Sequence, residues 1–256
     1  MEEAKKLIAN LKSFNRKERF HLVAYALNNR TFEINGKFKE KLMKLIPDAD
    51  FPKKDTDSYD DDFYFASMDY HLDWIYASLC LVCSDTIDPF ENKTVNVKKK
   101  VKENGKYEEK NVDEYIIKGS IEDVDLIIAI GSKSSPKKVH LIMIEAKGDA
   151  SWSMGQLNSK VQRLEAFFPE GPNEWEDFVV PHYILMSPEN PFKSTRTDFQ
   201  NKMINQLHWF SINEKGDPFI QLNMNNQIPQ KELKKVVRCN KKREKEKKGD
   251  YWYVSK

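Results

Sequence analysis

Residues 139–163, VHLIMIEAKGDASWSMGQLNSKVQR, decide the fold of this chain. The first six form an almost unbroken apolar run, typical of a strand that is buried on both faces in the middle of a sheet. The run ends in Glu145, Ala146 and Lys147, and because side chains alternate along a strand, Glu145 and Lys147 should point to one face. Burying a carboxylate and an ammonium there is costly unless they pair or hold a metal ion.

A helix is predicted directly after this strand. From Ser153 onward an apolar stripe recurs at helical spacing, made of Met154, Leu157, Val161, Leu164 and Phe168. Gln156, Lys160 and Arg163 follow at i, i+4 and i+7, so they share another face of the same helix. That face could meet a phosphate, but Ser153 and Gln156 also match a capping box, which needs no ligand.

A second apolar run, residues 126–130, precedes this strand and begins directly after Asp125. Residues 132–138 have turn composition, so the two runs are predicted to pair as antiparallel neighbours. In such a pair the start of the first strand lies beside the end of the second, which brings Asp125 close to Glu145 and Lys147. Two carboxylates and a lysine at one end of a sheet suit a hard cation such as Mg²⁺.

This combination resembles the PD-(D/E)xK nuclease superfamily, which has the restriction-endonuclease-like fold. The match consists of Asp125, then Glu145-x-Lys147 after an apolar strand, then a helix with Gln156 and Lys160, and it covers roughly residues 65–187. Val124 stands where the proline that gives the superfamily its name would be. The expected fold class is therefore α/β (α+β), with a central mixed sheet flanked by helices.

The resemblance implies a role for each of these residues. Asp125 and Glu145, together with the backbone carbonyl of Ala146, would hold Mg²⁺, with Mn²⁺ as an alternative ion. Lys147 would orient the attacking water or stabilise negative charge, and Gln156 and Lys160 would complete the catalytic set near the scissile phosphate. An acidic residue on the preceding helix, predicted over residues 65–82, would complete a second metal position or orient a bound water; Asp73 is the first candidate and Asp69 the second.

The remaining sequence predicts one compact unit in three parts. Residues 1–62 form a helical preface with an acidic loop, residues 63–190 the nuclease-like core, and residues 191–256 a C-terminal extension with a basic β-hairpin. Within these parts we expect helices over 2–14, from Asn15, and over 38–46, a hairpin over 94–101 and 107–117, and strands over 178–186, 233–239 and 251–255.

Charge is concentrated near the end of the chain. Residues 231–248 hold ten Lys or Arg against three Glu, a local net charge of +7, which leaves −5 for the rest of a chain whose total is +2. Lys241, Lys242 and Arg243 in this segment, with Lys160 and Arg163, are the predicted contacts to nucleic-acid phosphates. A solvated lysine-rich loop is the alternative interpretation of this segment.

Composition limits the class of protein. The start of the chain lacks the apolar core of a signal peptide, no run is long enough for a membrane span, and three cysteines give no disulfide framework. Composition thus predicts a soluble, cytoplasmic protein, and the resemblance implies a Mg²⁺-dependent DNA nuclease that acts in restriction, defence or repair. An endonuclease is favoured over an exonuclease. RNA as a substrate and a homodimer stay open. The alternatives are a non-catalytic nucleic-acid-binding or scaffold protein and a metal-dependent hydrolase of another phosphate ester.

Overall fold

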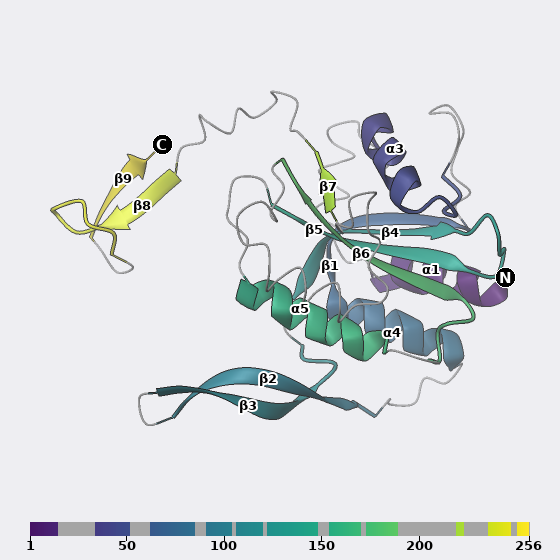
Figure 1. Ribbon diagram of the computed structural model, residues 1–256, viewed down its shortest axis with the longest axis horizontal. Coiled ribbons are helices and arrows are strands. Elements are labelled where there is room, and N and C mark those ends of the chain that lie inside the picture. The colour runs from purple at the N-terminus through teal and green to yellow at the C-terminus, as the bar shows by residue number, and fades with distance from the viewer. Residues whose placement is uncertain are drawn as a thin grey trace.

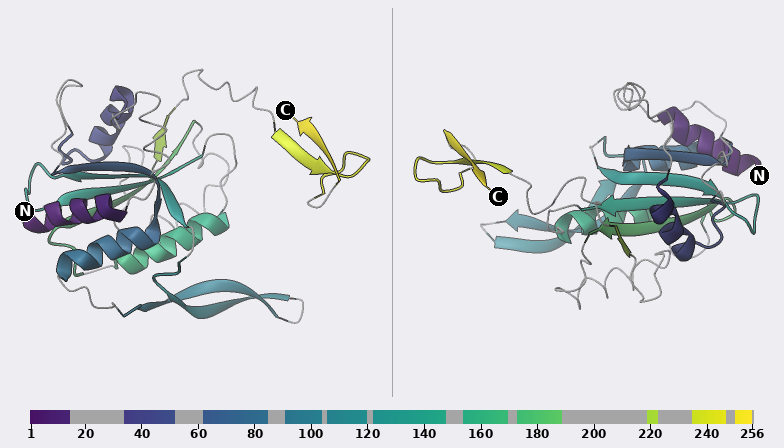
Figure 2. Two further views of the ribbon diagram at one scale, coloured as in Figure 1. Left: turned by 180° about the vertical axis from the view of Figure 1, so that it is seen from behind. Right: turned by 90° about the horizontal axis from the view of Figure 1, so that it is seen from above.

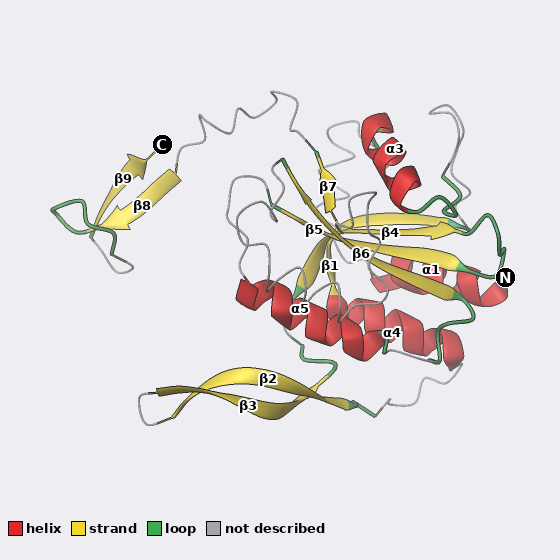
Figure 3. Ribbon diagram, in the orientation of Figure 1, coloured by secondary structure: helices red, strands yellow, loops and turns green. Residues whose placement is uncertain are grey.

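A mixed five-stranded sheet forms the centre of the molecule (Figures 1 and 3). The computed structural model describes residues 1–14, 34–51, 62–84, 91–103, 106–119, 122–147, 154–169, 173–188, 219–222, 235–246 and 250–255. Its sheet has the order β1-β4-β5-β6-β7, with strands β1 (Tyr64–His71), β4 (Asp123–Gly131), β5 (Val139–Ala146), β6 (Val179–Ser187) and β7 (Phe219–Gln221).

The central strand β5 has neighbours of both orientations. It pairs antiparallel with β4, from Leu126↔Ile144 to Gly131↔Val139, which confirms the pairing predicted from the turn between them. On its other side it runs parallel to β6, and helix α5 (Met154–Phe167) provides the crossover between these two strands. Seven of the eight β5 residues are buried, as the apolar run predicted.

Helices cover both faces of the sheet (Figures 1 and 2). One apolar cluster joins α1 (Glu2–Phe14), α4 (Leu72–Cys83) and α5 to one face, while α3 (Gly36–Leu45) packs with a second cluster on the opposite face. Helix α1 lies on α4, where Asn10 Nδ2 donates to the Ser78 carbonyl at 3.1 Å. The described part of the chain is therefore an α/β protein with a mixed five-strand sheet and four helices.

The helices predicted over residues 2–14 and 38–46 are confirmed as α1 and α3. The Asn35 side chain caps α3 by accepting a hydrogen bond from the Lys37 amide at 3.0 Å. The helix predicted from Asn15 lies outside the described residues, as does most of the acidic loop. No helix in the described ranges combines the length and apolar character needed to span a membrane.

The single helix predicted over residues 65–82 is wrong. The segment divides into strand β1 and helix α4, which meet at His71 and Leu72. Pairing of β1 with β4 runs from Tyr64↔Ile130 to His71↔Asp123 and omits Asp69, whose φ of 45° is left-handed. Asp69 and Asp73 consequently lie on different elements instead of one turn apart on a helix.

Two hairpins complete the described structure. The predicted hairpins are confirmed as β2 (Thr94–Glu103) with β3 (Lys106–Tyr115), and β8 (Lys235–Cys239) with β9 (Tyr251–Ser255). The β8–β9 hairpin stands apart from the central sheet in both views of Figure 2. Strand β7 comes from the predicted C-terminal extension but adds to the central sheet, so this sheet continues past the boundary predicted at residue 190.

Candidate active site

Glu145, at the end of β5, is the centre of the site. Its side chain is 4% exposed, and both carboxylate oxygens are bound by lysines: Oε1 by Lys147 Nζ at 3.1 Å and Oε2 by Lys160 Nζ at 2.5 Å. Lys147 directly follows β5, whereas Lys160 comes from α5. Because α5 packs over this face of the sheet through Leu157 and Val161, Lys160 reaches the buried Glu145 carboxylate and gives it a second cationic partner.

Asp125 lies beside the same end of β5. The last β4–β5 pair is Leu126↔Ile144, and one residue further the Asp125 carboxylate accepts a hydrogen bond from the Ala146 amide at 2.6 Å. This side chain thus continues the ladder where the backbone pairing ends. The predicted proximity of Asp125 to the Glu145-x-Lys147 segment is therefore a feature of the structure.

A second ion cluster forms around Arg163, one turn along α5 from Lys160. The Arg163 side chain is 1% exposed, and its guanidinium donates to Asp73, to Glu122 at 2.9 Å and to the Ile116 carbonyl at 2.8 Å. Asp73 also accepts a hydrogen bond from the Gly119 amide at 2.8 Å. The cluster ties α5 to the start of α4 and to the segment between β3 and β4.

Tyr183 of β6 is close enough to both clusters to be affected by their negative charges. It pairs with Met143 in the sheet and is fully buried. Burial raises the pKa of Tyr183 well above its usual value, and the nearby negative charges of Glu145, Asp125 and Glu122 raise it further. The phenol therefore stays neutral at ordinary pH.

The structure groups the predicted residues differently from the sequence. Asp125, Glu145, Lys147 and Lys160 meet at the end of β5, whereas Asp73 lies in the Arg163 cluster. The phosphate contact predicted for Arg163 does not fit the structure. Its guanidinium is enclosed and bound by protein groups, so it is not placed to contact a phosphate. Gln156 belongs to α5, but its side chain lies outside the described residues.

Sequence reasoning missed Glu122 and Tyr183. Glu122 precedes β4 in the acidic stretch EDVD, and no spacing marks it as the partner of an arginine 41 residues later. Tyr183 lies in a largely apolar strand without any motif of its own, and only the parallel β5–β6 register places it near the carboxylates. Both contacts depend on long-range packing that local periodicity does not report.

The opposite face of the sheet carries another polar cluster. His140 of β5 contacts His182 of β6 through Nδ1 and Nε2 at 2.9 Å, and its own Nε2 contacts Asp48 at 3.0 Å. A hydrogen bond from the Ser132 hydroxyl is the main cause that lowers the pKa of Asp48 to about 2. Burial lowers the pKa of His140, and burial followed by the charge of His140 lowers that of His182 to about 3.

The donor set at Glu145 and Asp125 determines which metal could be held there. Within the ranges that the structure describes, no three His, Cys, Asp or Glu side chains are grouped for metal binding. Mg²⁺ is often bound by only one or two carboxylates plus waters and substrate phosphates. Two carboxylates at one end of the sheet therefore fit Mg²⁺ better than a metal that needs a complete protein ligand cage.

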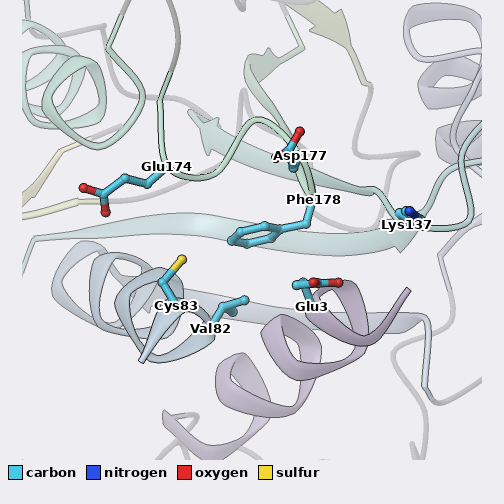
Figure 4. Close-up of a pocket in the computed structure, with 7 residues that line it drawn as sticks. All are labelled: Glu3, Val82, Cys83, Lys137, Glu174, Asp177 and Phe178. Atoms are coloured by element: carbon cyan, nitrogen blue, oxygen red, sulfur yellow. The ribbon is translucent and has the colours of Figure 1, made fainter. Parts of the chain in front are cut away.

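A pocket of about 670 Å³ lies at the other end of the sheet (Figure 4). It is lined by Glu3, Val82, Cys83, Lys137, Glu174, Asp177 and Phe178. Lys137 and Phe178 precede β5 and β6, whereas Glu145 and Lys147 lie where β5 ends. None of the predicted site residues lines this pocket.

Comparison with known proteins gives no match. The chain corresponds to no family model, no curated protein and no solved structure.

Proposed function

We propose that this chain is a Mg²⁺-dependent DNA nuclease with a restriction-endonuclease-like core, which hydrolyses phosphodiester bonds as an endonuclease. The observation that carries the proposal is the meeting of Asp125, Glu145 and Lys147 where β5 ends, with Lys160 of α5 beside them. The order of elements supports it: antiparallel β4 and β5 are followed by helix α5 within a mixed sheet flanked by helices, as the PD-(D/E)xK resemblance implies.

In this proposal Asp125 and Glu145 would hold Mg²⁺, with the Ala146 carbonyl as the predicted third ligand and Mn²⁺ as an alternative ion. When bound, such an ion supplies charge neutralisation at the phosphate and a more acidic water. The protein keeps the two carboxylates in place: Asp125 through the Ala146 amide, and Glu145 through two ammonium groups.

The two lysines have separate roles. The Lys147 side chain is 23% exposed, so part of it is open to a substrate at the end of the sheet. There it would stabilise the negative charge that develops on the phosphate during attack. The Lys160 side chain is only 11% exposed and lies within hydrogen-bond distance of Glu145, so it orients this carboxylate and offsets its burial.

The Arg163 cluster would act on this site indirectly. Its guanidinium joins Asp73 at the start of α4, Glu122 before β4 and the Ile116 carbonyl after β3. These contacts fix the position of α5, which carries Lys160. Asp73 thus has a positioning role in the proposal, in place of the second metal position predicted from the sequence.

A non-catalytic nucleic-acid-binding or scaffold protein is the second candidate. It is favoured by the fact that both oxygens of Glu145 already have a cationic partner within the chain. Such an ion cluster can serve folding alone, because a buried carboxylate is stabilised when its charge is compensated. The two candidates differ in whether the site does chemistry.

An assay of substrates and ions separates the candidates. Supercoiled plasmid, linear duplex, single-stranded DNA and RNA are incubated with the full chain in Mg²⁺, Mn²⁺ or EDTA. The proposal expects nicking of the plasmid in Mg²⁺ and none in EDTA. Binding without cleavage under every ion would favour the scaffold, and cleavage that persists in EDTA would exclude the assigned metal ligands.

A further inference from the structure

The β8–β9 hairpin presents an exposed tryptophan opposite an arginine. Trp252 is 66% exposed, and the strand register pairs it directly with Arg238, which is also exposed. Residues directly opposite in an antiparallel pair have their side chains on the same face. Exposing an indole to water is unfavourable, since the ring has a large apolar surface. This face therefore carries a flat aromatic surface next to a cation.

The turn beyond β8 holds its basic residues in a defined conformation. Asn240 organises it: its side-chain oxygen accepts hydrogen bonds from the amides of Lys242 at 2.9 Å and Glu244 at 3.1 Å. Its backbone amide donates to the Glu244 carbonyl at 3.0 Å, and its carbonyl accepts from the Arg243 amide at 3.0 Å. Lys241, Lys242 and Arg243 are all exposed, so the turn presents three cations to solvent from a fixed backbone.

We propose that this hairpin binds single-stranded nucleic acid, with a base stacked on Trp252 and the backbone phosphates at Arg238 and the basic turn. Bases in a duplex are covered on both faces by their neighbours, whereas an unpaired base can stack on an aromatic side chain. Residues 238–246 hold five Lys or Arg against two Glu, a net charge of +3, which complements a phosphate backbone. The inference rests on the proposed function, because it assumes that the chain is a nuclease and adds the class of nucleic acid that the hairpin would recruit.

Tyr251 provides a control within the same hairpin. It is 50% exposed, but as the neighbour of Trp252 in β9 it points to the opposite face, where it pairs with the buried Cys239. A strand of nucleic acid on the Trp252 face would not contact it. Removal of the Tyr251 ring should therefore leave binding unchanged if the face is assigned correctly.

The test measures binding of the full chain in EDTA, so that cleavage cannot interfere. Fluorescence anisotropy with a labelled 20-nucleotide oligothymidine and with a 20-base-pair duplex compares the two forms at several salt concentrations. We expect the single strand to bind at least tenfold more tightly than the duplex. Trp252→Ala should weaken single-strand binding roughly tenfold, which is the size of one base–aromatic stacking interaction, and Tyr251→Ala should change it less than twofold.

Several results would overturn the proposal. These are equal or tighter binding of the duplex, an unchanged affinity in Trp252→Ala, an equal weakening in Tyr251→Ala, or tighter binding to phosphatidylserine vesicles than to the oligonucleotide. Thermal melts of both variants show whether the fold is retained, and Trp252→Phe should recover most of the affinity because it keeps an aromatic face. Trp252→Phe that binds as weakly as Trp252→Ala would also count against stacking.

This test and the nuclease assay fail independently. Single-strand binding that is absent while Mg²⁺-dependent nicking of plasmid continues would overturn the hairpin assignment and keep the nuclease. Binding that depends on Trp252 without any cleavage would support the hairpin assignment and leave the second candidate function in place.

Discussion

Glu145 is held from two sides, and this determines what the removal of either lysine does to the fold. A buried carboxylate with a single partner becomes uncompensated when this partner is removed, at a cost of about 3–5 kcal/mol. Here Lys160 remains within 2.5 Å of Glu145 when Lys147 is removed, and Lys147 is the more exposed of the two. The chemistry and the stability of the site can therefore be tested separately.

Replacing Lys147 by Ala should abolish Mg²⁺-dependent cleavage and leave the fold nearly intact. The proposal assigns Lys147 to the transition state, so we expect a decrease of about a hundredfold or more in cleavage rate. Because Lys160 still compensates Glu145, the free energy of unfolding should change by about 1 kcal/mol or less. Plasmid nicking and a urea titration measure the two quantities.

Lys137→Ala is the matched control for this experiment, since Lys137 is an exposed lysine at the opposite end of β5. It should cleave as the parent chain does. A folded Lys147→Ala protein with full activity would refute the assignment of Lys147 to catalysis.

Replacing Arg163 by Met should destabilise the protein by about 3–5 kcal/mol, because Asp73 and Glu122 would lose the buried cation that compensates them. Adding Asp73→Asn to this variant should restore part of the stability, since one of the two uncompensated charges is then removed. Chemical denaturation of the single and double variants measures both effects.

Arg243→Met, which removes an exposed arginine, should change stability little. A stable Arg163→Met protein with weakened DNA binding would instead favour the phosphate contact predicted from the sequence.

At the scale of elements, the sequence predicts those helices and strands that have a characteristic pattern within their own residues. The apolar run of β5 and the turn before it have local signatures, and the structure confirms these predictions. Residues 64–83 do not have such a signature, because Met68, Leu72 and Ile75 continue one helical period across the boundary of β1 and α4. The backbone of β1 gains its hydrogen bonds from β4, which lies more than fifty residues away in the chain.

The site shows the same limit. The proximity of Asp125, Glu145 and Lys147 could be predicted from the sequence because a single turn connects their strands. The partner of Asp73 could not, because Arg163 reaches it only after α5 crosses the sheet between two parallel strands. Whether a polar helix residue such as Arg163 faces solvent or the interior depends on which carboxylates the tertiary fold places beneath it.

The paired histidines of β5 and β6 should make the protein less stable as pH falls. An unfolded histidine takes up a proton below about pH 6.5, whereas His182 in the fold has a pKa of about 3. Between these values the unfolded state binds more protons, so the free energy of unfolding decreases on acidification. The slope reaches about 1.4 kcal/mol per pH unit for one such proton.

Urea titrations between pH 7 and pH 5 test this prediction in a range where Asp48, with a pKa of about 2, stays ionised. In His182→Gln the free energy of unfolding should depend less steeply on pH than in the parent chain. The difference in slope should correspond to nearly one proton. Parallel curves for the two proteins would show that His182 is not the responsible group. The positive charge of Lys133 also lowers the pKa of His140. Lys133→Met removes this charge but keeps the His140–His182 contact, so it serves as a control for the contribution of that contact.

At the scale of the whole molecule, positive charge is separated from the candidate active site along the chain. The segment 231–248 has a net charge of +7, against −5 for the remaining residues, so a polyanion would be attracted mainly to this end. The described part of the segment lies in the β8–β9 hairpin, apart from the central sheet in Figure 1. Binding and cleavage are thus assigned to different parts of the molecule.

Neutralising Lys241, Lys242 and Arg243 together, each to Gln, should weaken nucleic-acid affinity equally for all sequences. These exposed cations are predicted to contact phosphates, which carry no sequence information. The dependence of log affinity on log salt should flatten by roughly 0.7 to 0.9 for each phosphate that is no longer bound. Filter binding at four salt concentrations gives the slope. A slope identical to that of the parent chain would assign the three residues to a solvated turn.

The two outer strands of the central sheet restrict how the chain can meet a second copy of itself. A long, regular edge strand offers unpaired amides and carbonyls to any other extended chain and so promotes aggregation. One edge here is β1, whose regular geometry is interrupted by the left-handed backbone of Asp69. The other edge is β7, which pairs over three residues. Over the residues described, β1 is regular only from Tyr64 to Met68 and β7 is paired over three residues, so a second copy that added a strand at either edge would meet only a short regular stretch.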